Sequence, residues 1–309
     1  MLTFSFAGCS DTSVNYSDGK LKIVTTVFPV YDWVRNIAGD NGNCDITMLL
    51  DMGVDLHSFQ PTADDLVRIS TCDVFFYVGG ESDDWVDDAL KDLQNKDAVT
   101  VNLMDALGDA VKEEAKGVEE SEDDGQDAHE AEYDEHIWLS LKNASKLTDV
   151  ICSALCKADG DNADEYKINA EKYKSEIDKL DGEYSLALKE CKNNTLVFGD
   201  RFPFIYLLND YGIDYFAAFS GCSTETNASF ETVITLAEKI NELSLNYIMV
   251  LEGSDSSTAE KIAESCKRDG VEILSLNSLQ YVTKADVENG CTYIDIMKDN
   301  LKVIEKALG

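Results

Sequence analysis

A long helical repeat in the middle of the chain restricts the architectures that this sequence can adopt. Between residues 161 and 192, apolar and tyrosine side chains recur at alternating spacings of 4 and 3 residues. They are Tyr166, Ala170, Tyr173, Ile177, Leu180, Tyr184, Ala187 and Cys191. This period places them on one face of an α-helix about 48 Å long, which exceeds an ordinary crossover. The only glycine is Gly182, so the segment is either one rigid helix or two helices broken there.

Strand and helix patterns alternate on both sides of this segment. Runs rich in β-branched and aromatic residues predict strands at 21–27, 44–50, 73–79, 98–103, 195–199, 214–219, 246–251 and 271–276. Helices opened by Pro29 and Pro61, and others at 204–211, 229–243, 256–268 and 292–308, lie between or after them. The alternation predicts an α/β fold of two lobes, each a mainly parallel sheet flanked by helices. We assign the lobes to 20–160 and 193–309, with 161–192 as the connecting helix.

The first 19 residues show the features of an export signal and a tether. An apolar run, MLTFSFA, leads into Gly8-Cys9-Ser10, and a polar stretch follows to Gly19. This resembles the end of a bacterial lipoprotein signal peptide, in which the cysteine is acylated. The basic region is absent, so the signal would be truncated, unless the tripeptide occurs by chance. The resemblance implies an exported chain that Cys9 anchors to the outer face of the cytoplasmic membrane, or a periplasmic one.

The charge of the chain limits its partners. Lys and Arg total 26 and Asp and Glu total 60, which gives a formal net charge of −34. Phosphate backbones repel such a chain and cations are attracted to it, so nucleic acid is not an expected partner. No stretch approaches the ~20 apolar residues of a membrane-spanning helix.

One segment, residues 113–135, departs from the alternation of strands and helices. It contains twelve acidic residues, one lysine and His129. Because it has so few apolar side chains, we predict a disordered loop. The loop is either an inert, solvated insertion or a low-affinity collector of cations.

The nine cysteines do not form a recognisable metal or redox motif. None belongs to a CxxC pair, which argues against a thiolate zinc knuckle. Most of the eight that follow Cys9 are expected to be small, buried apolar side chains. An exported chain permits disulfides, but the spacing assigns none.

Two of the three histidines point to a metal site. His57 lies in a loop after a predicted strand, and His136 follows the acidic segment. In α/β folds, ligands bind at loops that follow the carboxyl ends of strands. Neutral imidazole nitrogens suit Zn²⁺ well.

The segments around these histidines resemble those of zinc/manganese ABC-transporter solute-binding proteins. GVDLHSFQPTADDL is similar to the family's "GxDPHxYEPT" segment, and DEHIWLS is similar to its "DPHxWLSP" segment. The order also agrees: first histidine motif, acidic loop, second histidine motif, long helix and second lobe. The resemblance covers residues 20–309. It implies a monomer that binds Zn²⁺ or Mn²⁺ in a cleft between two lobes and delivers it to a membrane permease.

The resemblance implies ligands from four places, and His57 and His136 match the first two. Where the family carries a third histidine or a glutamate, this chain has Arg201, which stays protonated and cannot bind a metal. We therefore predict the adjacent Asp200 as third ligand, with Arg201 positioning it or bonding across the cleft. The alternative is a structural Asp200–Arg201 ion pair.

The fourth place is usually an aspartate, but Asn277 stands there. Its amide could hold a water, and His129 could complete the site. Glu225 and Glu252 are further candidates, although structural roles are expected for both. Two imidazoles favour Zn²⁺ over Mn²⁺, and additional carboxylates would favour Mn²⁺.

Two other classes of function could use the same two-histidine site. A metal-dependent hydrolase needs a similar ligand set, but the sequence contains no HExxH, GxSxG or GxxxxGK[ST] motif. A surface adhesin is the other alternative, since relatives of this family have been called adhesins, but no feature of the sequence demands a partner surface. We therefore predict a binding protein and not an enzyme.

Overall fold

In the part of the chain that the structure describes, eight short strands form two parallel sheets, as the sequence predicts. The computed structural model describes residues 19–39, 42–118, 133–223 and 227–309. The first sheet has the order β2-β1-β3-β4, and the second has the order β6-β5-β7-β8. The strands are β1 (Leu21–Thr25), β2 (Cys44–Met48), β3 (Val74–Tyr77), β4 (Val99–Asn102), β5 (Thr195–Phe202), β6 (Asp214–Ser220), β7 (Tyr247–Leu251) and β8 (Glu272–Leu276). Because every pairing is parallel, the carboxyl ends of the strands share one edge in each sheet.

The helices begin where local sequence signals place them. Pro29 lies in the first turn of α1 (Phe28–Ala38), where its missing N–H costs nothing. Thr62 and Asp65 form a capping box at the start of α2 (Ala63–Thr71), so this helix begins two residues after Pro61. The others are α3 (Trp85–Lys91), α4 (Leu103–Leu107), α6 (Leu141–Ala158), α8 (Ile205–Asp210), α9 (Phe230–Leu243), α10 (Ser257–Ser265), α11 (Lys284–Glu288) and α12 (Tyr293–Leu308).

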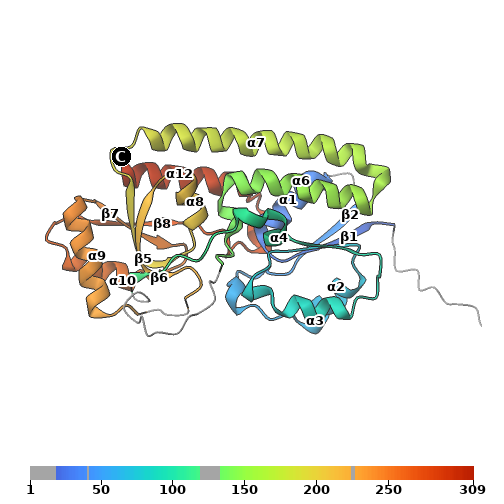
Figure 1. The fold of residues 1–309 in the computed structure, drawn as a ribbon, viewed down its shortest axis with the longest axis horizontal. Coiled ribbons are helices and arrows are strands. Elements are labelled where there is room, and N and C mark those ends of the chain that lie inside the picture. Colours follow the sequence, from blue (N-terminus) through green and yellow to red (C-terminus); the bar gives the residue numbers. More distant parts are fainter. Residues whose placement is uncertain (1–18, 40–41, 119–132, 224–226) are drawn as a thin grey trace, which may run out of the picture.

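The central repeat forms one unbroken helix, α7 (Ala163–Lys189), which continues through Gly182. Figure 1 shows α7 running along the whole molecule, over both sheets, with α12 and α6 beneath it. Its buried face carries the predicted residues from Tyr166 to Tyr184. The Tyr173 hydroxyl donates to Asp32 of α1 at 2.8 Å, and the Tyr184 hydroxyl donates to the Met297 carbonyl of α12 at 2.6 Å. The helix is therefore attached to elements from both ends of the chain.

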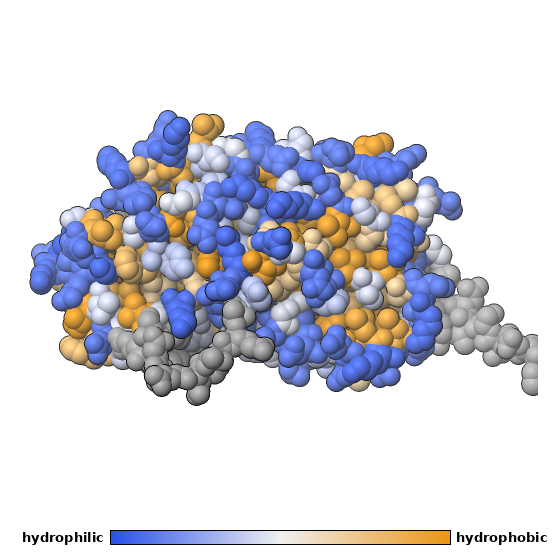
Figure 2. All heavy atoms as spheres, viewed as in Figure 1, coloured by the Kyte–Doolittle hydropathy of each residue, from blue (hydrophilic) through white to orange (hydrophobic). Residues whose placement is uncertain are grey.

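The apolar interior is continuous between the two halves of the molecule. The larger of two buried clusters contains strand residues from both sheets, together with the buried faces of α1, α6, α7 and α12. The smaller cluster lies between the second sheet and the helices α9 and α10. The face shown in Figure 2 carries many hydrophilic side chains with groups of apolar ones between them. Within the described residues, no helix combines the length and apolarity needed to cross a bilayer.

The structure differs from the predicted disordered loop at both ends of the acidic segment. Glu113 pairs with Tyr133 in an antiparallel bridge, and Ala115 is buried. Asp134 and Glu135 are also buried, because backbone N–H groups of His136 and Ser82 donate to their carboxylates. Residues 119–132, which include His129, lie outside the described residues, as do Cys9 and Glu225.

Candidate metal centre

His57 lies in the short 3₁₀ helix η1 (Leu56–Ser58), after β2. The Asp55 carboxylate accepts the His57 backbone N–H at 3.0 Å and so fixes this turn. In the ring, Nδ1 lies 2.8 Å from the Ser82 hydroxyl and 3.7 Å from Glu135 Oε2. The other nitrogen, Nε2, is buried and has no hydrogen-bond partner among the described residues. These contacts orient the imidazole and leave one nitrogen available.

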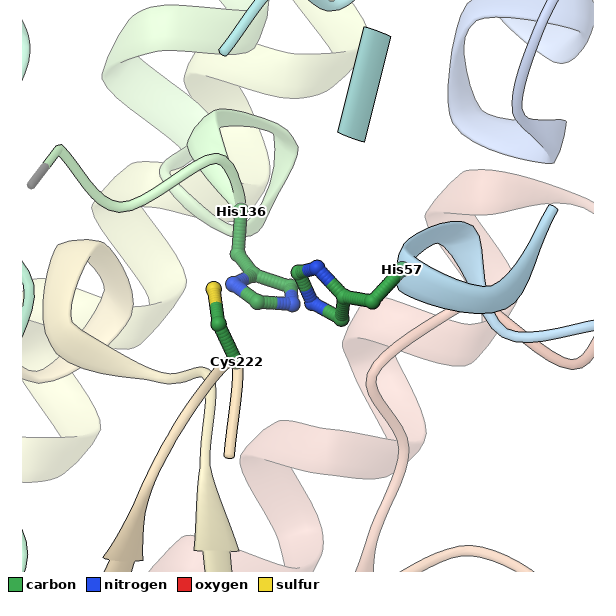
Figure 3. A group of neighbouring side chains, drawn as sticks. All are labelled: His57, His136 and Cys222. Carbon is green, nitrogen blue, oxygen red and sulfur yellow. The ribbon is translucent and has the colours of Figure 1, made fainter. Parts of the chain in front are cut away.

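His136 precedes the 3₁₀ helix η4 (Ile137–Leu139) and is fully buried. Asp134 Oδ1 lies 3.1 Å from its Nδ1 and accepts its backbone N–H at 2.9 Å. Its Nε2 is also buried without a partner in the described structure. An unpaired buried polar atom costs about 1–3 kcal/mol, so two of them on neighbouring imidazoles call for a ligand. The ring centroids lie 5.4 Å apart, and Figure 3 shows the rings turned toward each other.

Cys222 brings a sulfur atom from the second sheet to the same place. It follows the end of β6, and its backbone N–H donates to Glu114 at 2.7 Å. One ligand atom each from His57, His136 and Cys222 forms a group whose members lie within 4.8 Å of one another. Figure 3 shows the sulfur beside the His136 ring. Two imidazoles and one thiol are a suitable donor set for a borderline or soft divalent cation.

The electrostatics of the three groups follow from their burial and their neighbours. Burial lowers the pKa of His57 to about 4, and His136 adds to this effect, so the His57 ring is neutral at pH 7. Burial disfavours the charged form of His136 too, but the carboxylate of Asp134 outweighs it and raises the pKa of His136. Burial, with the charge of Glu114 next in size, raises the pKa of the Cys222 thiol. Without metal, Cys222 therefore carries its proton.

A cavity of about 640 Å³ adjoins this cluster and is lined by residues from both halves of the molecule. His57 and Asp55 line it from the first half, and Cys222, Arg201 and Tyr281 line it from the second. Arg201 crosses it: Nη1 donates to Asp55 at 2.7 Å and Nη2 donates to the Tyr281 hydroxyl at 2.8 Å. Arg201 thus bonds across the cleft, which was one of the two roles predicted for it.

The structure does not bring Asp200, Asn277 or Glu252 into the cluster. Asp200 lines the cavity, but its carboxylate accepts the backbone N–H groups of Arg201 at 2.8 Å and Leu251 at 3.1 Å. The Asn277 amide oxygen accepts the Leu279 N–H at 2.8 Å. Both carboxylate oxygens of Glu252 accept from Ser278. The group of side chains that could hold a metal therefore does not include Asp200, which was predicted as the third ligand, and Glu252 makes the kind of structural contact that was expected for it.

Sequence reasoning missed Cys222. It named Glu225, three residues later in the sequence, as a further candidate for which a structural role was expected. It set the cysteines aside because none forms a CxxC pair. The position of Cys222, two residues after a parallel strand of the second lobe, was the available signal, since ligands gather at such strand ends.

Comparison with known proteins places this chain in a family. Residues 23–307 match the model of the family described as "Zinc-uptake complex component A periplasmic", ZnuA. The chain belongs to the ZnuA family. This result confirms the resemblance found in the sequence, and the ZnuA family is one of binding proteins of zinc uptake.

Relatives and solved structures agree with this assignment. The chain is 29% identical to the "Zinc-binding protein AdcA" of Streptococcus pyogenes, over 93% of this chain and 56% of that protein. It therefore spans about half the length of the curated relatives that it first matches. It is 29% identical to the "High-affinity zinc uptake system protein ZnuA" of Bacillus subtilis, over 98% of this chain and 93% of that protein. The Zn(II)-bound ZnuA-like domain of Streptococcus pneumoniae AdcA superposes with a TM-score of 0.73, at 28% identity, over 94% of this chain and 99% of that one.

Proposed function

We propose that this chain is the extracytoplasmic solute-binding component of an ABC importer and that it binds Zn²⁺ as cargo through His57 and His136. The observation that carries the proposal is the pair of buried imidazole nitrogens, both unpartnered within the described structure and both oriented by hydrogen bonds from the other ring nitrogen. Such an arrangement is typical of histidines that bind a metal, because a partner on one nitrogen fixes the tautomer and leaves the second nitrogen free.

The names of the relatives support Zn²⁺ over Mn²⁺ as the cargo. Transport of the ion requires a membrane permease that accepts it, and we propose this permease as the partner. We also propose that Cys9 is lipidated and that residues 10–19 tether the protein to the outer face of the membrane. Incorporation of a labelled fatty acid that is lost in Cys9→Ser tests the anchor separately from the metal site.

Calorimetry on the demetallated full chain tests the metal site. The wild type is expected to bind one Zn²⁺ tightly, and His57→Ala and His136→Ala are each expected to lose at least about 100-fold in affinity, since even outer-shell partners of metal ligands are worth 10–100-fold. His129→Ala is the matched control, because His129 is the one other histidine in the sequence. This variant is expected to keep wild-type affinity.

Three results would contradict the proposal. The first is a wild-type protein that binds Zn²⁺ only at high-micromolar concentration or above. The second is wild-type affinity in both His57→Ala and His136→Ala. The third is hydrolysis of esters or phosphates that tracks metal occupancy, which would favour a metal-dependent hydrolase.

A further inference from the structure

We propose that Cys222 supplies a thiolate ligand from the second sheet, so that the site has two nitrogen donors and one sulfur donor and selects Zn²⁺ or Cd²⁺ against Mn²⁺. This inference rests on the proposed function, and it adds a ligand and a cation class to it. In the described structure, Cys222 is the one residue of the second half that joins the two histidines in a metal-binding group.

The spacing of the three donors is close to that of a zinc site. Zn–N bonds of about 2.0 Å and Zn–S bonds of about 2.3 Å put neighbouring donors of a tetrahedron about 3.3–3.6 Å apart. The three donors here lie within 4.8 Å of one another, so displacements of about 1 Å suffice to reach bonding distances. The fully buried His136, with an Nε2 that has no partner in the described structure, independently indicates that a ligand belongs at this place.

The backbone around Cys222 is held against the first half of the molecule. Glu114, at the start of the acidic segment, accepts the Cys222 N–H at 2.7 Å. Gly221 packs so closely that an added Cβ would lie 3.0 Å from the Phe202 carbonyl oxygen and 3.4 Å from Asp134 Oδ2. A larger residue at 221 would push the loop away from Asp134, which also holds His136. These contacts place the sulfur beside the histidines before any ion binds.

The donor set determines the class of cation. When Zn²⁺ binds, the Cys222 thiol releases its proton to solvent and the sulfur lone pair forms the Zn–S bond, with no change of oxidation state. Thiolate and imidazole donors favour Zn²⁺ and softer cations, whereas Mn²⁺ prefers carboxylate and carbonyl oxygens. Asp200 and Glu252, the nearby carboxylates of the second half, are occupied by backbone N–H groups and by Ser278. Neither of them therefore joins the group formed by His57, His136 and Cys222.

Cobalt spectroscopy tests the sulfur ligand directly. Co²⁺ added to the demetallated full chain is expected to give the near-ultraviolet charge-transfer band of a cobalt–thiolate bond. The band is expected to disappear in Cys222→Ser and Cys222→Ala. The matched control is Cys266→Ala, which removes another half-buried thiol of the second half and should keep the band. Cys222→Ala is also expected to lose at least about tenfold in Zn²⁺ affinity with little change for Mn²⁺.

The outcomes separate this inference from the proposed function. If Co²⁺ binds stoichiometrically without the charge-transfer band, Cys222 is not a ligand, while the solute-binding function stands. If no cation binds to the wild type, the proposed function fails first. If the Cys222 variants fail to fold, the test uses the wild type instead. Its cysteines are alkylated with iodoacetamide with and without Zn²⁺, and mass spectrometry measures the alkylation of Cys222. Protection of Cys222 by Zn²⁺ supports the ligand, and equal alkylation with and without Zn²⁺ overturns it.

Discussion

Asp83 is a buried carboxyl group behind the metal site, and it makes the stability of the protein depend on pH. It lies in the 3₁₀ helix η2 (Glu81–Asp83), one residue after the Ser82 that contacts His57. Its side chain is almost completely buried. Oδ2 accepts the Gly79 N–H at 2.9 Å, whereas Oδ1 has no partner in the described structure. Burial is the main reason that its pKa is raised to about 7, and the charge of Glu135 adds to the increase.

The size of the effect follows from the two pKa values. The unfolded chain loses this proton near 3.8, and the folded protein keeps it until about 7. Between these values the folded state binds more protons, so the free energy of unfolding falls as pH rises. At about 1.4 kcal/mol per pH unit, roughly three units amount to about 4 kcal/mol. The full cost is present above pH 7 and absent below pH 3.8.

Asp83→Asn removes the ionisation and keeps an oxygen that can accept from Gly79. Urea unfolding of the demetallated protein at several values between pH 4 and pH 8 measures the difference in stability between variant and wild type. We expect this difference to shift in favour of the variant by about 4 kcal/mol from pH 4 to pH 8. A part of the difference that is the same at every pH reflects the amide itself, so only the change with pH tests the argument. Asp84→Asn, at the exposed neighbouring position, controls for the loss of one charge. A difference that stays flat with pH would refute the reasoning.

Three further predictions concern the cleft, the long helix and strand β5. Asp55→Asn leaves the mostly buried Arg201 without its carboxylate and is expected to cost about 1–3 kcal/mol at pH 7. Although burial alone would raise the pKa of Asp55, its contacts with Arg201 lower it. The cost should therefore shrink as pH falls through that lowered pKa, which urea unfolding at a series of pH values from 7 downward would show. Gly182→Ala, with nothing within 4 Å of the added Cβ, should stabilise α7 by about 1 kcal/mol. Gly199→Ala, whose Cβ would lie 2.7 Å from the Ala259 backbone, should destabilise the protein by about 1–3 kcal/mol. Opposite shifts of the thermal midpoint are the expected readout.

The fold could be predicted from the sequence because its signals are local. All eight predicted strands are present, since each is a short run of β-branched and aromatic residues between clear helical patterns. The long helix was equally clear: six residues of its repeat, from Tyr166 to Tyr184, form its buried face. Gly182 did not break it, because the cost of one glycine is small compared with the packing of that face.

The set of metal ligands could not be predicted in the same way. An acid that follows a strand, such as Asp200, looks like a ligand in the sequence, but two backbone N–H groups from different segments occupy its oxygens. A lone cysteine such as Cys222 looks like a small buried side chain. Its position beside two histidines from the other half arises only from tertiary contacts, including the one with Glu114. The buried positions of Asp134 and Glu135 depend on tertiary structure too.

The proposed exchange of donors in the second half has a simple geometric basis. β5 and β6 are neighbouring parallel strands, so the residues that follow them emerge at the same edge of the sheet. The family resemblance predicts a donor near the end of β5, where this chain has Arg201, and the sulfur of Cys222 arrives from the end of β6 instead. Arg201 would repel a cation if it were unpaired, but Asp55 neutralises it across the cleft. Asp55 also fixes the turn that carries His57. A single carboxylate would thus make an arginine compatible with the proposed cation site, and it holds the turn that carries His57 in place.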